Sequence, residues 1–107
     1  MNPGELLLIL HEHGVHVRVD GAGLYLTGNP PDELRAWVMH WRGCLHSLVA
    51  IAVPTLCHGM TAAEREAFEE RAAILEADGG YPRELAERAA VWWTRTQAQP
   101  APTARAA

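Results

Sequence analysis

The chain contains no lysine, so all nine of its basic residues are arginine. These arginines are scattered along the sequence, no basic block occurs, and the formal net charge is −4. Proteins that bind a nucleic-acid backbone need clustered positive charge to neutralise the phosphates. The composition therefore argues against a protein whose main task is to bind DNA or RNA.

Cysteine is also scarce: Cys44 and Cys57 are the two in the chain, too few for the disulfide framework of a small secreted domain. The apolar run at residues 6–10 is short and follows the acidic Glu5, so it does not match a signal peptide. No run approaches the roughly 20 apolar residues of a membrane span. We therefore expect a bacterial cytoplasmic protein.

Residues 6–27, LLLILHEHGVHVRVDGAGLYLT, predict one short helix that leads directly into a two-stranded hairpin. Asn2 can cap the helix, Pro3 suits its first position, and Gly14 is placed to end it. From Val15 the pattern has period two, which is typical of a strand with one buried face. Its apolar side carries Val15, Val17, Val19, Leu24 and Leu26, and its polar side His16, Arg18, Asp20, Tyr25 and Thr27.

The glycine-rich turn after Asp20 joins the two strands, because glycine tolerates positive φ. A proline-rich connector follows, and Asp32 is the expected cap of the next helix. The clearest amphipathic stripe comes next: Leu34, Trp37, Val38, Trp41, Leu45, Leu48 and Val49. Gly43 can divide this stripe into two helices, and Pro54 should end it, with a break over residues 54–60.

The C-terminal part predicts a helical hairpin over residues 56–96. Thr61 and Glu64 form a capping-box pattern that starts a helix running to about Asp78. We expect its apolar side to carry Ala67, Phe68, Ile74 and Leu75. Gly79 and Gly80 should end it, and Pro82 should begin a second, antiparallel helix in which Trp92 or Trp93 is partly exposed. Residues 97–107 are expected to be a disordered tail.

Four potential metal ligands, His40, Cys44, Cys57 and His58, lie within a short stretch of sequence. Their spacing matches no standard zinc finger, so we expect no bound metal and no other cofactor. His40 and His46 are expected to lie in solvent on the outer face of their helix. The sequence also has no nucleophile motif and no phosphate-binding glycine loop, which predicts that the protein is not an enzyme.

The order of helix, Gly-Val, alternating strand, Asp-Gly turn, second strand, proline-rich connector and leucine-rich helical end resembles the TubC N-terminal docking domain family. The matching positions are Leu6, Leu7, Leu10, Gly14, Val15, Val17, residues 21–24, Pro30, Pro31, Leu34, Arg35 and residues 45–48. The likeness covers about residues 4–53. It implies an αββαα fold that dimerises at the front of a nonribosomal peptide or polyketide synthase subunit. It also implies recognition of the C-terminal tail of an upstream subunit, which adds as a strand to the hairpin.

We therefore predict an α+β protein with a docking-like αββαα domain at residues 1–55, followed by the helical hairpin and the tail. Its expected activity is non-catalytic docking of a partner protein, as a homodimer. The predicted partner-binding residues are His16, Arg18, Tyr25, Thr27, Trp37 and Trp41, of which Arg18 would attract an acidic tail. Without the resemblance, the same residues predict an ordinary α+β domain with a solvated hairpin.

Two further functions stay open. Residues 70–76 and 78–80 resemble a segment of small bacterial mobile-element proteins. This likeness implies an accessory protein of a phage or integrative element that acts near DNA replication through protein contacts. A metal-binding regulator is the third possibility, and bound zinc would distinguish it from the other two.

Overall fold

The computed structural model describes residues 1–97 of the chain. These residues form six helices and a two-stranded antiparallel hairpin. In chain order the elements are α1 (Pro3–Glu12), β1 (His16–Asp20), β2 (Gly23–Thr27), α2 (Asp32–His40), α3 (Arg42–Ala50), α4 (Val53–Leu56), α5 (Ala62–Ala77) and α6 (Arg83–Gln97). The described chain is mostly helical and consistent with the predicted α+β class. The predicted disordered tail lies outside the described residues from residue 98 onward.

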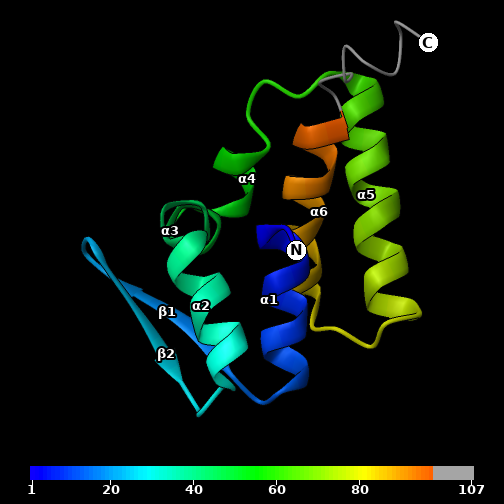
Figure 1. Cartoon of the computed structure of the whole chain (residues 1–107). Coiled ribbons are helices and arrows are strands. Elements are labelled where there is room, and N and C mark those ends of the chain that lie inside the picture. Colours follow the sequence, from blue (N-terminus) through cyan, green and yellow to red (C-terminus); the bar gives the residue numbers. More distant parts are fainter. Residues whose placement is uncertain (98–107) are drawn as a thin grey trace, which may run out of the picture.

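Helix α1 lies in the middle of the molecule, between α2 and α3 on one side and α6 on the other (Figure 1). Its start is fixed as predicted, since the Asn2 side-chain oxygen accepts a hydrogen bond from the Glu5 N–H at 2.8 Å. Pro3 occupies the first helical position, where a missing N–H removes no helical bond. Leu6 and Leu10 are fully buried, so α1 anchors the core.

One apolar core joins the N-terminal half of the chain to its C-terminal helices. Its buried members are Leu6, Leu7, Leu10, Val15, Leu34, Val38, Leu45, Leu48, Cys57, Phe68, Ala72, Ala90 and Val91. Helix α6 packs along α1, and α5 covers the far side of α6 (Figure 1). The predicted division between residues 55 and 56 falls inside α4, and the core is continuous across it.

The hairpin has the predicted register and faces. Val17 pairs with Leu26 and Val19 with Leu24. All four side chains are half-buried, and Val17, Leu24 and Leu26 pack against the core. Gly21 has φ +59°, and no non-glycine residue between 1 and 97 has positive φ, which matches a type II′ turn with glycine at its first central position. Figure 1 shows the hairpin projecting from the side of the molecule opposite α5. The predicted period-two pattern is therefore confirmed.

Three details of the middle segment differ from the sequence-based expectation. The prediction that Asp32 caps α2 is wrong, because Pro31 holds the N-cap position and Asp32 is the first helical residue. A carboxylate there still complements the helix dipole. The apolar stripe divides at Trp41 rather than at Gly43. Pro54 does not lie in a break but in the first turn of α4, where its missing N–H breaks no helical bond.

Helices α5 and α6 form the predicted antiparallel pair. The Thr61 hydroxyl accepts a bond from the Glu64 N–H at 3.1 Å, and the Glu64 carboxylate accepts one from the Thr61 N–H at 2.9 Å. The hydrogen bond from the Thr61 N–H is the main cause that lowers the pKa of the Glu64 carboxyl. The capping box is therefore confirmed. At the other end of the pair, Arg83 on α6 contacts the carboxylates of Glu69 and Glu76 on α5.

The buried side of α5 differs in part from the prediction. Phe68 and Ala72 lie one turn apart and are buried, as their i, i+4 spacing allows. Ile74 lies off this line, and 41% of its surface is exposed, so its assignment to the apolar side is wrong. On α6, Trp92 and Trp93 are both half-buried, which agrees with the expectation that the pair cannot be buried completely.

Replacing Val17 with Asp should collapse the fold. The side chain packs on the core from the inner face of β1, and an unpaired charge there costs on the order of 3 kcal/mol or more. Loss of amide dispersion in the NMR spectrum would report this. The control Thr27→Asp places the same charge on the exposed face and should leave the spectrum well dispersed. A dispersed spectrum for Val17→Asp would contradict the observed register.

Candidate functional site

Four of the predicted site residues form one exposed surface on the hairpin. We call the face carrying His16, Arg18, Tyr25 and Thr27 the outer face; all four are exposed, and Tyr25 is 56% accessible. The ladder pairs His16 with Thr27 and Arg18 with Tyr25. The Thr27 hydroxyl donates to the His16 carbonyl at 3.4 Å, a long hydrogen bond. The outer face is therefore open to a partner across both strands.

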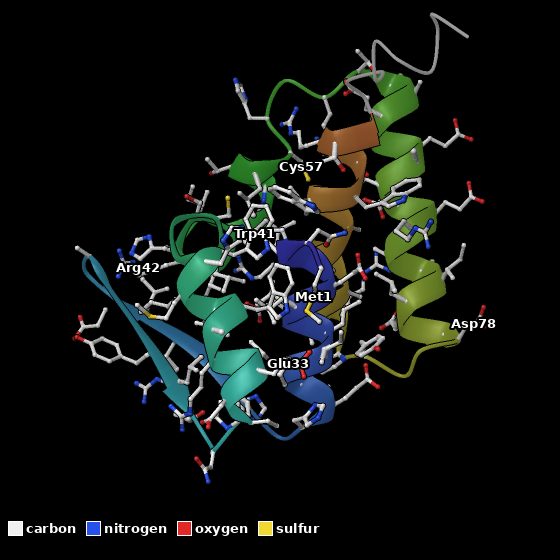
Figure 2. The ribbon with its side chains drawn as sticks, viewed as in Figure 1. Met1, Glu33, Trp41, Arg42, Cys57 and Asp78 are labelled. Carbon is white, nitrogen blue, oxygen red and sulfur yellow. The ribbon has the colours of Figure 1, made fainter. Side chains whose placement is uncertain are left out.

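The other two predicted residues lie elsewhere. Trp37 and Trp41 are half-buried against the core, and the Trp41 Nε1–H donates to the Met1 carbonyl at 2.8 Å. The Trp41 ring also makes an edge-to-face contact with Trp92, with centroids 5.8 Å apart. Figure 2 shows Trp41 near the start of α1, away from the hairpin. The structure thus places these two tryptophans in internal contacts rather than beside the outer face.

The strand edges of the hairpin carry backbone groups that the ladder does not use. In a hairpin with a two-residue loop, the closing pair exchanges both backbone hydrogen bonds, and that pair here is Asp20 and Gly23. The ladder bonds of β1 therefore fall on His16, Arg18 and Asp20. The N–H and C=O groups of Val17 and Val19 point away from β2, and no other backbone bond within residues 1–97 engages them.

A groove runs beside the β1 edge. This edge groove has a volume of about 220 Å³ and lies between β1, α1, the end of α3 and the start of α6. Apolar side chains make up most of its lining, and none of the lining residues belongs to β2. The residues that line it are Leu7, His11, Val15, His16, Val17, Val49, Pro82, Glu84, Leu85 and Arg88.

Hydrogen bonds hold the α6 wall of the edge groove in place. The Arg88 guanidinium donates to the Leu48 carbonyl at 2.5 Å and the Ile51 carbonyl at 2.7 Å, both at the end of α3. The same guanidinium contacts the Glu84 carboxylate at 3.1 Å. Carbonyls at a helix end have no partner within the helix, so Arg88 both caps α3 and fixes its distance from α6.

A second contact lies next to the Pro82 end of the groove. The Tyr81 hydroxyl donates to the Glu12 carboxylate at 2.7 Å, which joins the α5–α6 loop to the end of α1. This hydrogen bond and partial burial raise the pKa of Tyr81. The Tyr81 ring packs edge-to-face against His11, with centroids 6.1 Å apart. The polar groups around the groove are therefore largely engaged in holding its walls.

His46 secures the tip of the hairpin, which the sequence did not indicate. Its Nε2–H donates to the Gly21 carbonyl at 2.7 Å, since a carbonyl oxygen can only accept. The expectation that His46 lies in solvent is wrong, because the hairpin folds back over this part of α3. His40 is exposed as predicted, although its ring also packs against Trp37 and Trp41.

The wall residues Glu84, Leu85 and Arg88 were missed as site residues. In the sequence, Glu84 and Arg88 form an i, i+4 pair of the kind found on any solvated helix face, and Leu85 is an ordinary apolar position of the same helix. Only the packing of α6 on α1 brings them beside β1, and no local pattern reports that contact.

A broader apolar cleft of about 460 Å³ lies between α3, α4 and α6. Cys44, Leu56 and Trp92 contribute to its lining, and Arg95 supplies its charged group. The Arg95 guanidinium already donates to the carbonyls of Leu56 and His58. Ligand sites combine apolar walls with several convergent polar groups, and this cleft has few.

The potential metal ligands do not converge. Within residues 1–97, no group of three or more His, Cys, Asp or Glu side chains is placed to hold a metal ion. Cys57 is buried in the core, and burial is the main cause that raises the pKa of its thiol. Cys44 is half-buried on α3.

Comparison of the chain with protein-family models, with curated proteins and with solved structures finds no match. In the part of the chain that the structure describes, no helix combines the length and the apolar character needed to cross a membrane.

Replacing His46 with Ala should loosen the hairpin tip without unfolding the protein. Loss of one hydrogen bond costs about 1 kcal/mol, measurable as a lower free energy of unfolding in urea. Amide exchange at Gly21 and Ala22 should also accelerate. The control His58→Ala removes an exposed imidazole far from the hairpin and should change neither quantity. Equal exchange at the tip in both variants would show that the His46 bond does not restrain it.

The two cysteines should differ in reactivity at neutral pH. A raised pKa leaves little thiolate at Cys57, and burial blocks access, so iodoacetamide should label Cys44 well before Cys57. Mass spectrometry of the digested protein measures the ratio, and labelling in denaturant, where both thiols react, is the control. Equally fast labelling of both in the folded protein would contradict the burial of Cys57.

Proposed function

We propose that the protein is a non-catalytic docking domain that recognises the C-terminal tail of a partner protein by strand addition to its hairpin. The partner would be an upstream subunit of a megasynthase, the class implied by the resemblance to TubC-type docking domains. The single observation that carries the proposal is the unpaired β1 edge beside an apolar groove.

A two-stranded sheet leaves both edges free, and unpaired backbone groups are a template for another extended chain. In strand addition, main-chain hydrogen bonds supply affinity, and pockets for alternate side chains supply specificity. Val17 and Val19 offer two N–H and two C=O groups of this kind, and the edge groove lies next to Val17. Both components of this recognition mode therefore occur side by side.

The element order gives separate support. Helix α1, strands β1 and β2, and helices α2 and α3 follow one another in the αββαα order that the resemblance implies. Helices α4 to α6 are additional to this order, and α6 supplies one wall of the edge groove. We propose that α1 to α3 form the docking unit and that the later helices complete its binding surface.

Arg18 on the outer face could attract an acidic tail, although the exposed Asp20 lies two residues further along the same strand. Arg18 is exposed on β1, and none of the ion pairs among residues 1–97 involves it. A carboxylate on an added strand would meet this guanidinium at the edge of the sheet. Exposed pairs contribute modestly, so Arg18 would select and orient the tail while the backbone bonds supply most of the affinity.

The direct test is an NMR titration of the labelled protein with C-terminal tail peptides from proteins encoded beside it. Strand addition predicts amide shifts concentrated in β1 and β2 and slower exchange of amides on one strand edge. Shifts confined to the surroundings of Trp92 and Trp93, or no shifts with any of these tails, would contradict the proposal.

Replacing Arg18 with Glu should leave the fold intact and weaken binding of an acidic tail about fivefold, or roughly 1 kcal/mol. The control Arg65→Glu makes the same charge change on α5, on the opposite side of the molecule (Figure 1). Isothermal titration calorimetry of both variants with the same tail separates the effect of a charge on the hairpin from the effect of the net charge of the protein. If the two variants bind the tail with equal affinity, Arg18 does not belong to the binding site.

A further inference from the structure

The two edges of the hairpin differ in what lies beside them. Ladder geometry leaves the backbone N–H and C=O groups of Val17 and Val19 without hydrogen bonds on the β1 edge. The same holds on the β2 edge for the backbone groups of their cross-strand partners, Leu26 and Leu24. The edge groove is lined by Val15, His16 and Val17 but by no residue of β2. The two edges therefore offer an incoming strand the same backbone groups but different surroundings.

We infer that the partner strand adds to β1 and inserts one apolar side chain into the edge groove. This inference rests on the proposed docking function and names the edge and the chemistry of the peptide. Added on this side, a strand meets free backbone groups and, directly beside them, a wall formed by Val49 and Leu85.

The size of the groove indicates a single side chain as its occupant. Small-molecule sites usually enclose roughly 300–1,000 Å³, whereas the edge groove holds about 220 Å³. An aliphatic or aromatic side chain needs less room than a cofactor and would cover the apolar lining formed by Leu7, Val49 and Leu85. Burial of such a side chain contributes the hydrophobic part of the affinity.

Exposed acidic side chains lie at the α6 end of the groove. At the α6 end, the Glu84 side chain is 74% exposed, and its partner Arg88 also donates to two carbonyls. The Glu12 carboxylate lies at the same end, held by Tyr81. Toward the hairpin tip, β1 exposes Arg18 and then Asp20, so this end carries both signs of charge. The complementary peptide therefore has a basic residue at the α6 end and an apolar anchor next to it, and an acidic residue further along can meet Arg18.

A second copy of the chain does not supply this anchor from its own β1. Its Val17 side chain packs on its own core, its Val19 side chain is half-buried on the same inner face, and its outward residues His16, Arg18 and Asp20 are polar. Residues 98–107 offer no large apolar side chain either, since they consist of Ala, Pro, Gln, Thr and Arg. Neither β1 nor residues 98–107 of a second copy therefore supplies the anchor, and we take a separate peptide as the occupant.

The test uses a synthetic peptide of alternating valine and threonine, with glutamates at one end and lysines at the other, and a second peptide with these ends exchanged. The labelled full-length chain is titrated with each. We expect the amides of Val17 and Val19 to shift and become protected from exchange, with one peptide orientation bound more tightly. Protection at Leu24 and Leu26 instead would overturn the choice of β1 while leaving strand addition intact.

Proline substitution distinguishes the two edges. Val19→Pro removes an outward-pointing N–H from β1, and Leu24→Pro removes one from the facing position of β2. Neither N–H takes part in a hydrogen bond between the two strands, and neither side chain lines the groove. We expect Val19→Pro to weaken the peptide at least about tenfold and Leu24→Pro to change affinity little. The opposite pattern would place the peptide on β2.

A charge exchange provides a test that leaves the hairpin unchanged. Glu84→Lys should weaken the tighter peptide about fivefold, and replacing the peptide's lysines with glutamates should restore binding to that variant. The control Glu66→Lys makes the same charge change on α5, away from the groove, and should have no effect. Equal effects of both variants, or no binding of either peptide, would overturn the inferred anchor chemistry. Tails from neighbouring genes would then test the docking function independently.

Discussion

The structure depends on covering one face of a two-stranded hairpin, because such a hairpin is marginally stable by itself. The inner face presents Val17, Val19, Leu24 and Leu26, and contacts with α1 and α3 cover it in part, so that these side chains are half-buried. Covering that face leaves the outer face and both strand edges free. The stability of the hairpin and its capacity to bind thus have one physical origin: the helices cover a single side of a sheet that has no third strand.

The C-terminal helices turn one of these free edges into a binding groove. Without α6, the β1 edge would face solvent; with it, Leu85 forms an apolar wall beside the strand. Arg88 fixes this wall by bonding to the end of α3, and Tyr81 fixes its start by bonding to Glu12. A continuous core, rather than a flexible linker, joins the two halves of the chain. The groove is therefore built before a partner arrives, which lowers the ordering cost of binding.

Local sequence signals predicted the secondary structure well because each acts within a few residues. The Asn2 cap, the Thr61 capping box and the alternating valines were all confirmed. The incorrect details depend on contacts between distant segments or on alternatives of similar energy. His46 bonds to the hairpin tip 25 residues away, and proline suits the first turn of a helix as well as a break. The outer face could be predicted from period-two alternation, but the groove could not, since four separate elements line it.

The most direct test of an open β1 edge is residue-resolved amide hydrogen exchange of the protein without a partner. An unpaired edge predicts an alternating pattern along β1, with slow exchange at Arg18 and Asp20 and fast exchange at Val17 and Val19. This pattern would show that the edge is free before binding. Slow exchange at Val17 and Val19 in the isolated protein would mean that something already pairs with the edge, and it would contradict strand addition to β1.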